Sequence, residues 1–128
     1  MLRRLLIVLL CLVSVCTACF SQINTERVIL MGRNALYYED YVLAIQRFNS
    51  VISAKPYLAE PFFYRGLAKF YLEDLAGAEA DCSLALERRP YTAQYYTLRG
   101  LCRVNMEMYD LAVQDYRSSL QQNPMERN

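Results

Sequence analysis

Residues 59–91 read AEPFFYRGLAKFYLEDLAGAEADCSLALERRPY. Within this stretch, Gly66 begins a series that continues with Ala78, Cys82 and Pro90. The same series occurs once before and once after it, at identical offsets and with no insertion between the copies. The equivalent residues are Gly32, Ala44, Phe48 and Pro56 in the first copy, and Gly100, Ala112, Tyr116 and Pro124 in the third. A period of about 34 residues is typical of stacked helical hairpins, so the sequence predicts an all-α solenoid.

Each of the three units, at about residues 25–58, 59–92 and 93–126, is predicted to form two helices joined by a tight turn. In the middle unit the helices are expected at about residues 59–72 and 75–88. Asp74 lies just before the second helix and can cap it, and Asp40 holds the same place in the first unit. Met108 replaces this residue in the third unit, where the cap is expected to be lost. The proline after each second helix ends it, because proline lacks an amide donor.

A glycine lies midway along each predicted first helix, where it costs about 1 kcal/mol relative to alanine. Three such glycines at one spacing indicate close helix packing, since the separation of two helices follows the size of the side chains between them. The alanines of the repeat are expected to oppose the glycines. Phe48, Cys82 and Tyr116 follow one turn later on the same face and are expected to fill the space beyond.

These residues resemble the tetratricopeptide repeat family, whose pattern is W-x-x-L-G-x-x-Y, then A-x-x-x-F, then P. The glycine, alanine and proline positions match in all three units, over about residues 25–126. Other positions depart from the pattern. The tryptophan position holds Val28, Phe62 and Tyr96, the leucine position Met31, Arg65 and Arg99, and the tyrosine position Ala35, Lys69 and Arg103. Arg65 and Arg99 are expected to present charge near a helix edge.

The resemblance implies a right-handed solenoid whose first helices line a concave groove, with groove positions spread over residues 26–37, 60–71 and 94–105. Aromatic side chains suit the binding of a peptide or a helix, because they provide contact area at a low cost in entropy. The alternative is that the aromatic side chains pack between hairpins as core. The predicted contact residues are Arg33, Tyr37, Phe63, Tyr64, Leu67, Tyr71 and Leu98.

Some members of the family grip the C-terminal carboxylate of chaperones with basic and amide side chains at set groove positions. Those positions here hold Ile29, Arg33, Tyr64, Gln94 and Leu98. Only Arg33 has a suitable side chain, so this carboxylate clamp is not expected.

The composition argues against catalysis and against nucleic acid as a partner. The chain has no histidine, the commonest general base and metal ligand, and no cofactor or small-molecule substrate is indicated. The net charge of +1, from 14 basic and 13 acidic residues, leaves no basic excess to neutralise phosphates. Acidic pairs at Glu39–Asp40, Glu73–Asp74 and Glu79/Asp81 are interpreted as capping and solvated residues rather than acid/base catalysts.

Two cysteines lie within the repeats. Cys82 occupies a core position and is expected to act as a small apolar filler. Cys102 is expected to lie near the second helix of the middle unit. Whether these two residues form a disulfide depends on their geometry, which the sequence leaves open.

Residues 1–21 precede the repeat domain at 22–128 and are interpreted as a signal peptide. They combine a basic start with an apolar run from Leu5 to Phe20, shorter than a comfortable membrane span. Cleavage before Gln22 is the first expectation, because Cys19 and Ser21 are small residues at the required positions. Lipidation of Cys19 is the alternative, and only then is the chain expected on a membrane. Either way the repeats are expected outside the cytoplasm, in a bacterial periplasm or beyond the cell.

The sequence therefore favours an exported, non-enzymatic interaction module that binds a peptide or partner protein through the groove. The alternative is a structural subunit that oligomerises through its last repeat, because a solenoid without a polar terminal cap exposes an apolar face. Leu111, Val113, Tyr116 and Leu120 are expected to contribute to that face. The identity of the partner stays open.

Overall fold

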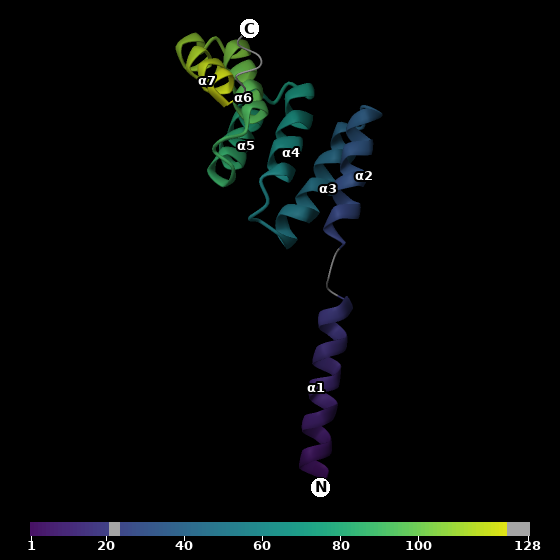
Figure 1. The fold of residues 1–128 in the computed structure, drawn as a ribbon. Coiled ribbons are helices and arrows are strands. Elements are labelled where there is room, and N and C mark those ends of the chain that lie inside the picture. The colour runs from purple at the N-terminus through teal and green to yellow at the C-terminus, as the bar shows by residue number, and fades with distance from the viewer. Residues whose placement is uncertain (21–23, 123–128) are drawn as a thin grey trace.

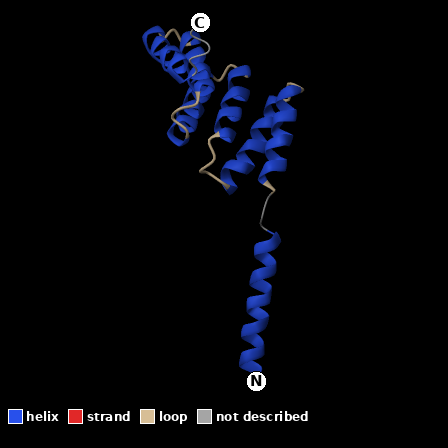
Figure 2. Cartoon of the chain, in the orientation of Figure 1, coloured by secondary structure: helices blue, strands red, loops and turns tan. Residues whose placement is uncertain are grey.

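The computed structural model describes residues 1–20 and 24–122, and for residues 15–20 the backbone alone. All the regular elements in these ranges are helices (Figure 2). They are α1 (Leu2–Phe20), α2 (Thr25–Tyr37), α3 (Tyr41–Ala54), α4 (Glu60–Tyr71), α5 (Leu75–Arg88), α6 (Ala93–Asn105) and α7 (Tyr109–Gln122). In the middle unit α4 is one residue shorter at each end than predicted, and α5 has the predicted bounds.

Helices α2 to α7 form three antiparallel hairpins, α2–α3, α4–α5 and α6–α7, which stack in chain order (Figure 1). Each second helix packs on the first helix of the next hairpin, as α3 does on α4 and α5 on α6. First helices also contact one another directly, whereas α3 and α5, or α5 and α7, do not. The first helices therefore lie on the inside of the curve, and the predicted solenoid with a concave first-helix face is confirmed.

The turn inside each hairpin uses a glutamate in the left-handed region of φ. Glu39, Glu73 and Glu107 have φ values of 62°, 64° and 61°. A residue with a Cβ atom pays roughly 1–2 kcal/mol for this conformation. The next residue in the first two hairpins is the predicted helix cap. Asp40 accepts a hydrogen bond from the Leu43 amide at 3.2 Å, and Asp74 accepts one from the Gly77 amide at 3.0 Å. The positive φ at these turns could not be predicted from the sequence, because glutamate rarely adopts this conformation.

The helix glycines provide room for a facing side chain, but their neighbours differ from expectation. A Cβ atom built on Gly32 would lie 2.6 Å from Phe48, and one on Gly100 would lie 2.9 Å from Tyr116. In these two units the aromatic ring, rather than the alanine, lies over the glycine. Only at Gly66 is the alanine helix backbone close, with the Ala78 carbonyl 3.2 Å away. The reason is that the smaller Cys82 replaces the aromatic side chain in the middle unit.

A buried ionic network joins the two helices of the second and third hairpins. Asp81 and Asp115 are each 2% exposed. Arg65 donates to Asp81 from Nε and Nη2 at 2.9 and 2.6 Å, and Lys69 lies 3.1 Å from the same carboxylate. The interpretation of Asp81 as a solvated residue is therefore wrong, and Arg65 pairs inside the hairpin instead of presenting its charge at an edge.

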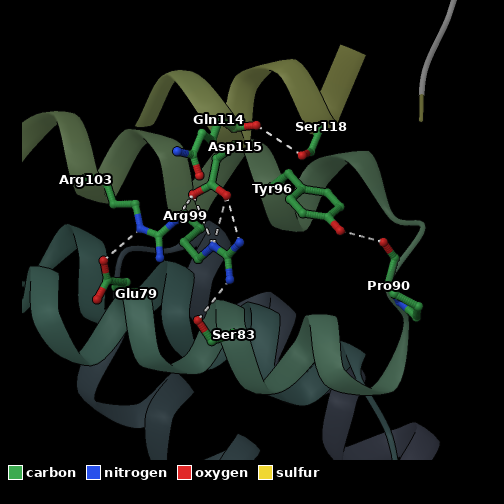
Figure 3. Close-up of polar contacts among 9 residues, drawn as sticks. All are labelled: Glu79, Ser83, Pro90, Tyr96, Arg99, Arg103, Gln114, Asp115 and Ser118. Carbon is green, nitrogen blue, oxygen red and sulfur yellow. Dashed lines mark hydrogen bonds and ion pairs between the residues drawn. The ribbon is translucent and has the colours of Figure 1, made fainter. Parts of the chain in front are cut away.

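The third hairpin repeats this network with the same chain spacing (Figure 3). Arg99 donates to Asp115 from Nε at 3.1 Å and from Nη2 at 2.7 Å, and Arg103 Nη1 donates to Asp115 at 2.7 Å. The preceding helix α5 adds two acceptors, since Ser83 Oγ accepts from Arg99 and Glu79 accepts from Arg103. Glu79 is thus half-buried and paired, where solvation was expected.

Cys82 and Cys102 lie together at the junction of α5 and α6, and both are free thiols with no exposed surface. The pKa of Cys82 is raised, first by its side-chain hydrogen bond with Cys102 and then by burial. Cys82 is the apolar filler that was predicted, and it shares a cluster with Ala78 and Leu98. The structure has these two adjacent residues as free thiols, and whether they are oxidised to a disulfide stays open.

Helix α1 contacts none of the other helices (Figure 1). Among the described residues, no helix is long and apolar enough to cross a membrane. The predicted cleavage before Gln22 and the lipidation of Cys19 concern side chains outside the described residues. Pro124 and the last four residues also lie outside them, whereas Pro56 and Pro90 follow the ends of α3 and α5 as expected.

Candidate protein-interaction groove

A row of aromatic side chains crosses from the first hairpin to the third, beginning at Phe48 of α3 and continuing over the first helices α4 and α6. Tyr64 of α4 stacks on Phe48 at 5.5 Å between ring centroids, with the planes 17° apart. Phe63 lies 5.3 Å from Tyr64 and 5.0 Å from Tyr95 of α6. Phe48 and Tyr95 are buried, whereas Phe63 and Tyr64 keep part of their surface exposed. The two central rings therefore pack on buried neighbours and keep part of their surface accessible.

Tyr64 is the polar centre of this row. The guanidinium of Arg33 on α2 lies 5.4 Å from the centroid of its ring, a cation–π contact. Burial raises the pKa of Tyr64, the positive charge of Arg33 lowers it, and Glu60 raises it as a nearby charge and hydrogen-bond partner. The net shift is upward, so the phenol stays protonated at neutral pH and can donate a hydrogen bond.

The other predicted contact residues fall into two groups. Arg33, Tyr37 and Tyr71 are exposed, with Tyr37 81% and Tyr71 55% accessible. Tyr71 stacks on Tyr41 of α3 at 5.0 Å, which fixes the ring at the turn edge of the concave face. These side chains offer surface to a partner without contributing to the core.

Leu67 and Leu98 belong to the core side of the same helices. Leu98 is 6% exposed and packs with Ala78, Cys82 and Cys102, so the structure leaves it little surface for a partner. Leu67 is half-buried and packs against the same cluster. The alternative interpretation, that some groove positions are core, is correct for Leu98. The sequence could not separate these leucines from the tyrosines because all of them lie on the same helical face.

A hollow of about 210 Å³ opens where α2 meets α4, next to the aromatic row. Its charged lining residues are Glu26, Glu60, Lys55 and Arg89, and Ile29 contributes apolar surface. Lys55 and Arg89 were not predicted as site residues. Each directly precedes a repeat proline, so the two are at equivalent positions of successive units. This repeated basic position is the feature of the sequence that could have identified them. The mixed charges suit the polar side chains or the terminus of a peptide.

The described residues contain no group of three or more cysteine, aspartate, glutamate or histidine side chains that could hold a metal ion. The groove itself brings together aromatic rings, one arginine and one glutamate. This set can bind by stacking, cation–π contact and hydrogen bonding.

No family model and no curated protein matches the chain. Solved structures do. The first tetratricopeptide (TPR) domain of human RPAP3 is 27% identical, with 78% of this chain and 79% of that chain covered and a TM-score of 0.76. The TPR domain of Arabidopsis OM64 is 24% identical, with 79% and 84% covered and a TM-score of 0.77. The TPR2B domain of yeast Sti1, in complex with pHsp70, is 21% identical, with 77% and 79% covered and a TM-score of 0.75.

These neighbours share the hairpin architecture described above, so the chain folds as a tetratricopeptide repeat solenoid. The resemblance found in the sequence is confirmed. The first TPR domain of RPAP3 has also been solved with the HSP90 peptide SRMEEVD bound.

Proposed function

We propose that the chain is a non-enzymatic interaction module that binds a peptide or an extended segment of a partner protein on its concave face. The observation that carries this proposal is the exposed side of the aromatic row, with Tyr64 held between Phe48 and Arg33. Preordered aromatic rings bind with little loss of side-chain entropy. The peptide complexes of RPAP3 and Sti1 support the same use of the fold.

The partner differs in chemistry from the HSP90 peptide. Among the five clamp positions, Ile29 and Tyr64 replace polar groups by apolar or aromatic ones, and Leu98 is buried. Only Arg33 remains to pair with a carboxylate. We therefore expect SRMEEVD to bind more weakly than about 1 mM, when measured by isothermal titration calorimetry on the full chain.

The test of the groove uses peptides selected from a random display library against the full chain. Arg33→Ala and Tyr37→Ala remove exposed groove side chains and leave the core intact, so we expect each to weaken the selected peptide about tenfold or more. Tyr57→Ala and Tyr91→Ala are matched controls, because these tyrosines are also exposed, at 68% and 80%, but follow the repeat prolines. Selected peptides that bind both groove variants as tightly as the wild type, or a library that yields no binding peptide, would count against the groove as the binding site.

Export of this module is part of the proposal and rests on residues 1–21, together with the lack of contact between α1 and the hairpins. The mass of the mature N-terminus distinguishes cleavage before Gln22 from lipidation of Cys19. An intact Met1 on the mature protein from its native cell would contradict both.

A second candidate function is assembly through α7. Leu111, Val113 and Leu120 on this last helix are 38%, 45% and 36% exposed, and no described residue covers them. If this surface joins subunits, Val113→Glu and Leu120→Glu dissolve an oligomer seen by analytical ultracentrifugation, while Arg33→Ala leaves it intact. A wild-type chain that sediments as a monomer at high concentration would exclude self-assembly.

A further inference from the structure

Within the described residues, no helix covers the first hairpin on the side where the other two hairpins have a neighbour. Ala68 of α4 is packed against Ala44 and Phe48 of α3, and it has no exposed surface. Cys102 of α6 holds the same place in the third unit and is buried against α5. The corresponding residue of α2 is Asn34, which is exposed. The side of the first hairpin around Asn34 is called the N-terminal end face below.

This face is hollowed. An open cavity of about 370 Å³ lies between α2 and α3, and its lining includes Met31, Asn34, Tyr38, Leu43 and Arg47. Met31 is 38% and Tyr38 78% exposed. The surface is thus mainly apolar. It is equivalent to the surfaces of the second and third hairpins that α3 and α5 cover.

The positions of the ionic network carry different charges in the first hairpin than in the other two. Arg47 holds the place in the first unit that Asp81 holds in the second, and Met31 and Ala35 replace the cations Arg65 and Lys69. Arg47 makes no ion pair in the described residues, and its Nε is buried without a hydrogen-bond partner. Asp40 also lines the cavity, but its carboxylate caps α3 at the Leu43 amide. A buried donor left unpaired is costly, so a carboxylate from outside would be favoured here.

The leader and a second copy of the chain could also cover the N-terminal end face, but neither would place a carboxylate opposite Arg47. The leader, residues 1–21, contains no aspartate or glutamate. A second copy stacked end to end would bring α7 onto the face, with Arg117 in the place where Asn49 and Ser83 accept from Arg65 and Arg99. Arg117 would then lie near Arg47, and like charges at a desolvated contact repel.

We propose that the N-terminal end face docks an amphipathic helix of another protein, in the position that α3 and α5 take on the following hairpins, with a glutamate or aspartate paired to Arg47. The contact of Glu79 on α5 with Arg103 on α6, at 2.9 Å, is the internal precedent for such a pair (Figure 3). This face is separate from the concave face, so the proposal stands or falls independently of the proposed groove function.

The test uses two helical peptides built on the α5 sequence, because α5 already covers an equivalent face. The acidic peptide keeps Glu79 and carries Ser83→Glu, the basic one carries Glu79→Lys and Ser83→Lys, and both carry Cys82→Ala. A staple between positions 76 and 80, which are exposed on α5, holds the isolated helix. Fluorescence anisotropy on the full chain is expected to show the acidic peptide binding at least tenfold tighter than the basic one.

Substitutions at the face locate this preference. Arg47→Glu is expected to reverse the order of the two peptides and Arg47→Met to abolish the difference, whereas Arg117→Glu at the far end changes neither. Thermal unfolding followed by circular dichroism checks that Arg47→Glu still folds, since Arg47 makes no ion pair within the described residues that the substitution could break. The absence of binding by both peptides, or an order that Arg47→Glu leaves unchanged, would overturn the proposal.

The other occupants give distinct results. A wild-type oligomer in sedimentation that Arg47→Glu dissolves would assign the face to a second copy instead. Nuclear Overhauser contacts between the Met31 methyl group and leader side chains in the free protein would assign it to the leader. Either result would overturn the choice of a partner protein.

Discussion

The first hairpin and the two that follow it have the same scaffold but different polar interiors. In the second and third hairpins, a buried aspartate joins the two helices through an arginine and a second cation. In the first, Arg47 takes the place of the aspartate and makes no ion pair within the described residues. The arginines Arg65 and Arg99 also reach back to Asn49 and Ser83 on the preceding hairpin. The network therefore accompanies hairpins that have an N-terminal neighbour, while the glycines and alanines are common to all three.

The largest expected effect comes from breaking the network in the third hairpin. Asp115→Asn leaves Arg99 and Arg103, which are only 19% and 15% exposed, without their shared carboxylate. Removing one partner of a buried ion pair costs about 3 kcal/mol or more. We expect this loss in the free energy of unfolding, measured by urea denaturation. Asp81→Asn should behave in the same way.

The matched variant in the first hairpin is Arg47→Met. Because Arg47 makes no ion pair with any described residue and its buried Nε has no acceptor among them, we expect unchanged or slightly higher stability in the same assay. A loss from Arg47→Met comparable to that from Asp115→Asn would mean that the two interiors do not differ as described.

The next effect in size concerns the helix glycines. In Gly32→Ala the new methyl group meets the ring of Phe48, which is fully buried and cannot move away. Such overpacking costs about 1–3 kcal/mol, more than the gain in helix propensity. In Gly100→Ala the facing ring is that of Tyr116, which is partly exposed and can shift, so a smaller loss is expected. Equal losses in thermal unfolding would show that both rings are held alike.

The smallest expected effect separates the two junctions between hairpins. Cys102→Ala introduces the residue found at the equivalent position of the other junction, Ala68, and we expect it to lower the free energy of unfolding by about 1 kcal/mol.

In the unaltered chain, burial and the raised pKa keep Cys82 protonated and inaccessible. In the chain with its leader retained, iodoacetamide at pH 8 should therefore modify exposed Cys11 quickly and Cys82 only after unfolding, as read by site-resolved mass spectrometry.

Rapid labelling of Cys82 in the folded protein would contradict its burial. Isolation of the chain with both repeat cysteines unreactive even after unfolding, and with a mass lower by two hydrogens, would show that the disulfide forms. Because the two cysteines are adjacent across α5 and α6, this measurement decides the question that the sequence left open.

Much of the fold could be predicted because it depends on patterns of residues that are close together in the sequence. The strict repeat, its glycines and its prolines define three hairpins, and the structure places the middle helices within one residue of the prediction. The caps at Asp40 and Asp74 were predictable for the same reason, since a cap depends on residues three apart. The candidate groove was predictable only as a helix face, which mixed the exposed Tyr71 with the buried Leu98.

By itself, therefore, the sequence determined the architecture and the list of side chains available to bind. Only the tertiary structure decided which of them are occupied, because this depends on what the neighbouring helix brings opposite each residue. Arg65 and Asp81 are 16 residues apart and meet through the packing of α4 on α5. Arg47 has the same chain spacing from Met31, but Met31 carries no charge, so the corresponding ion pair is absent from the first hairpin.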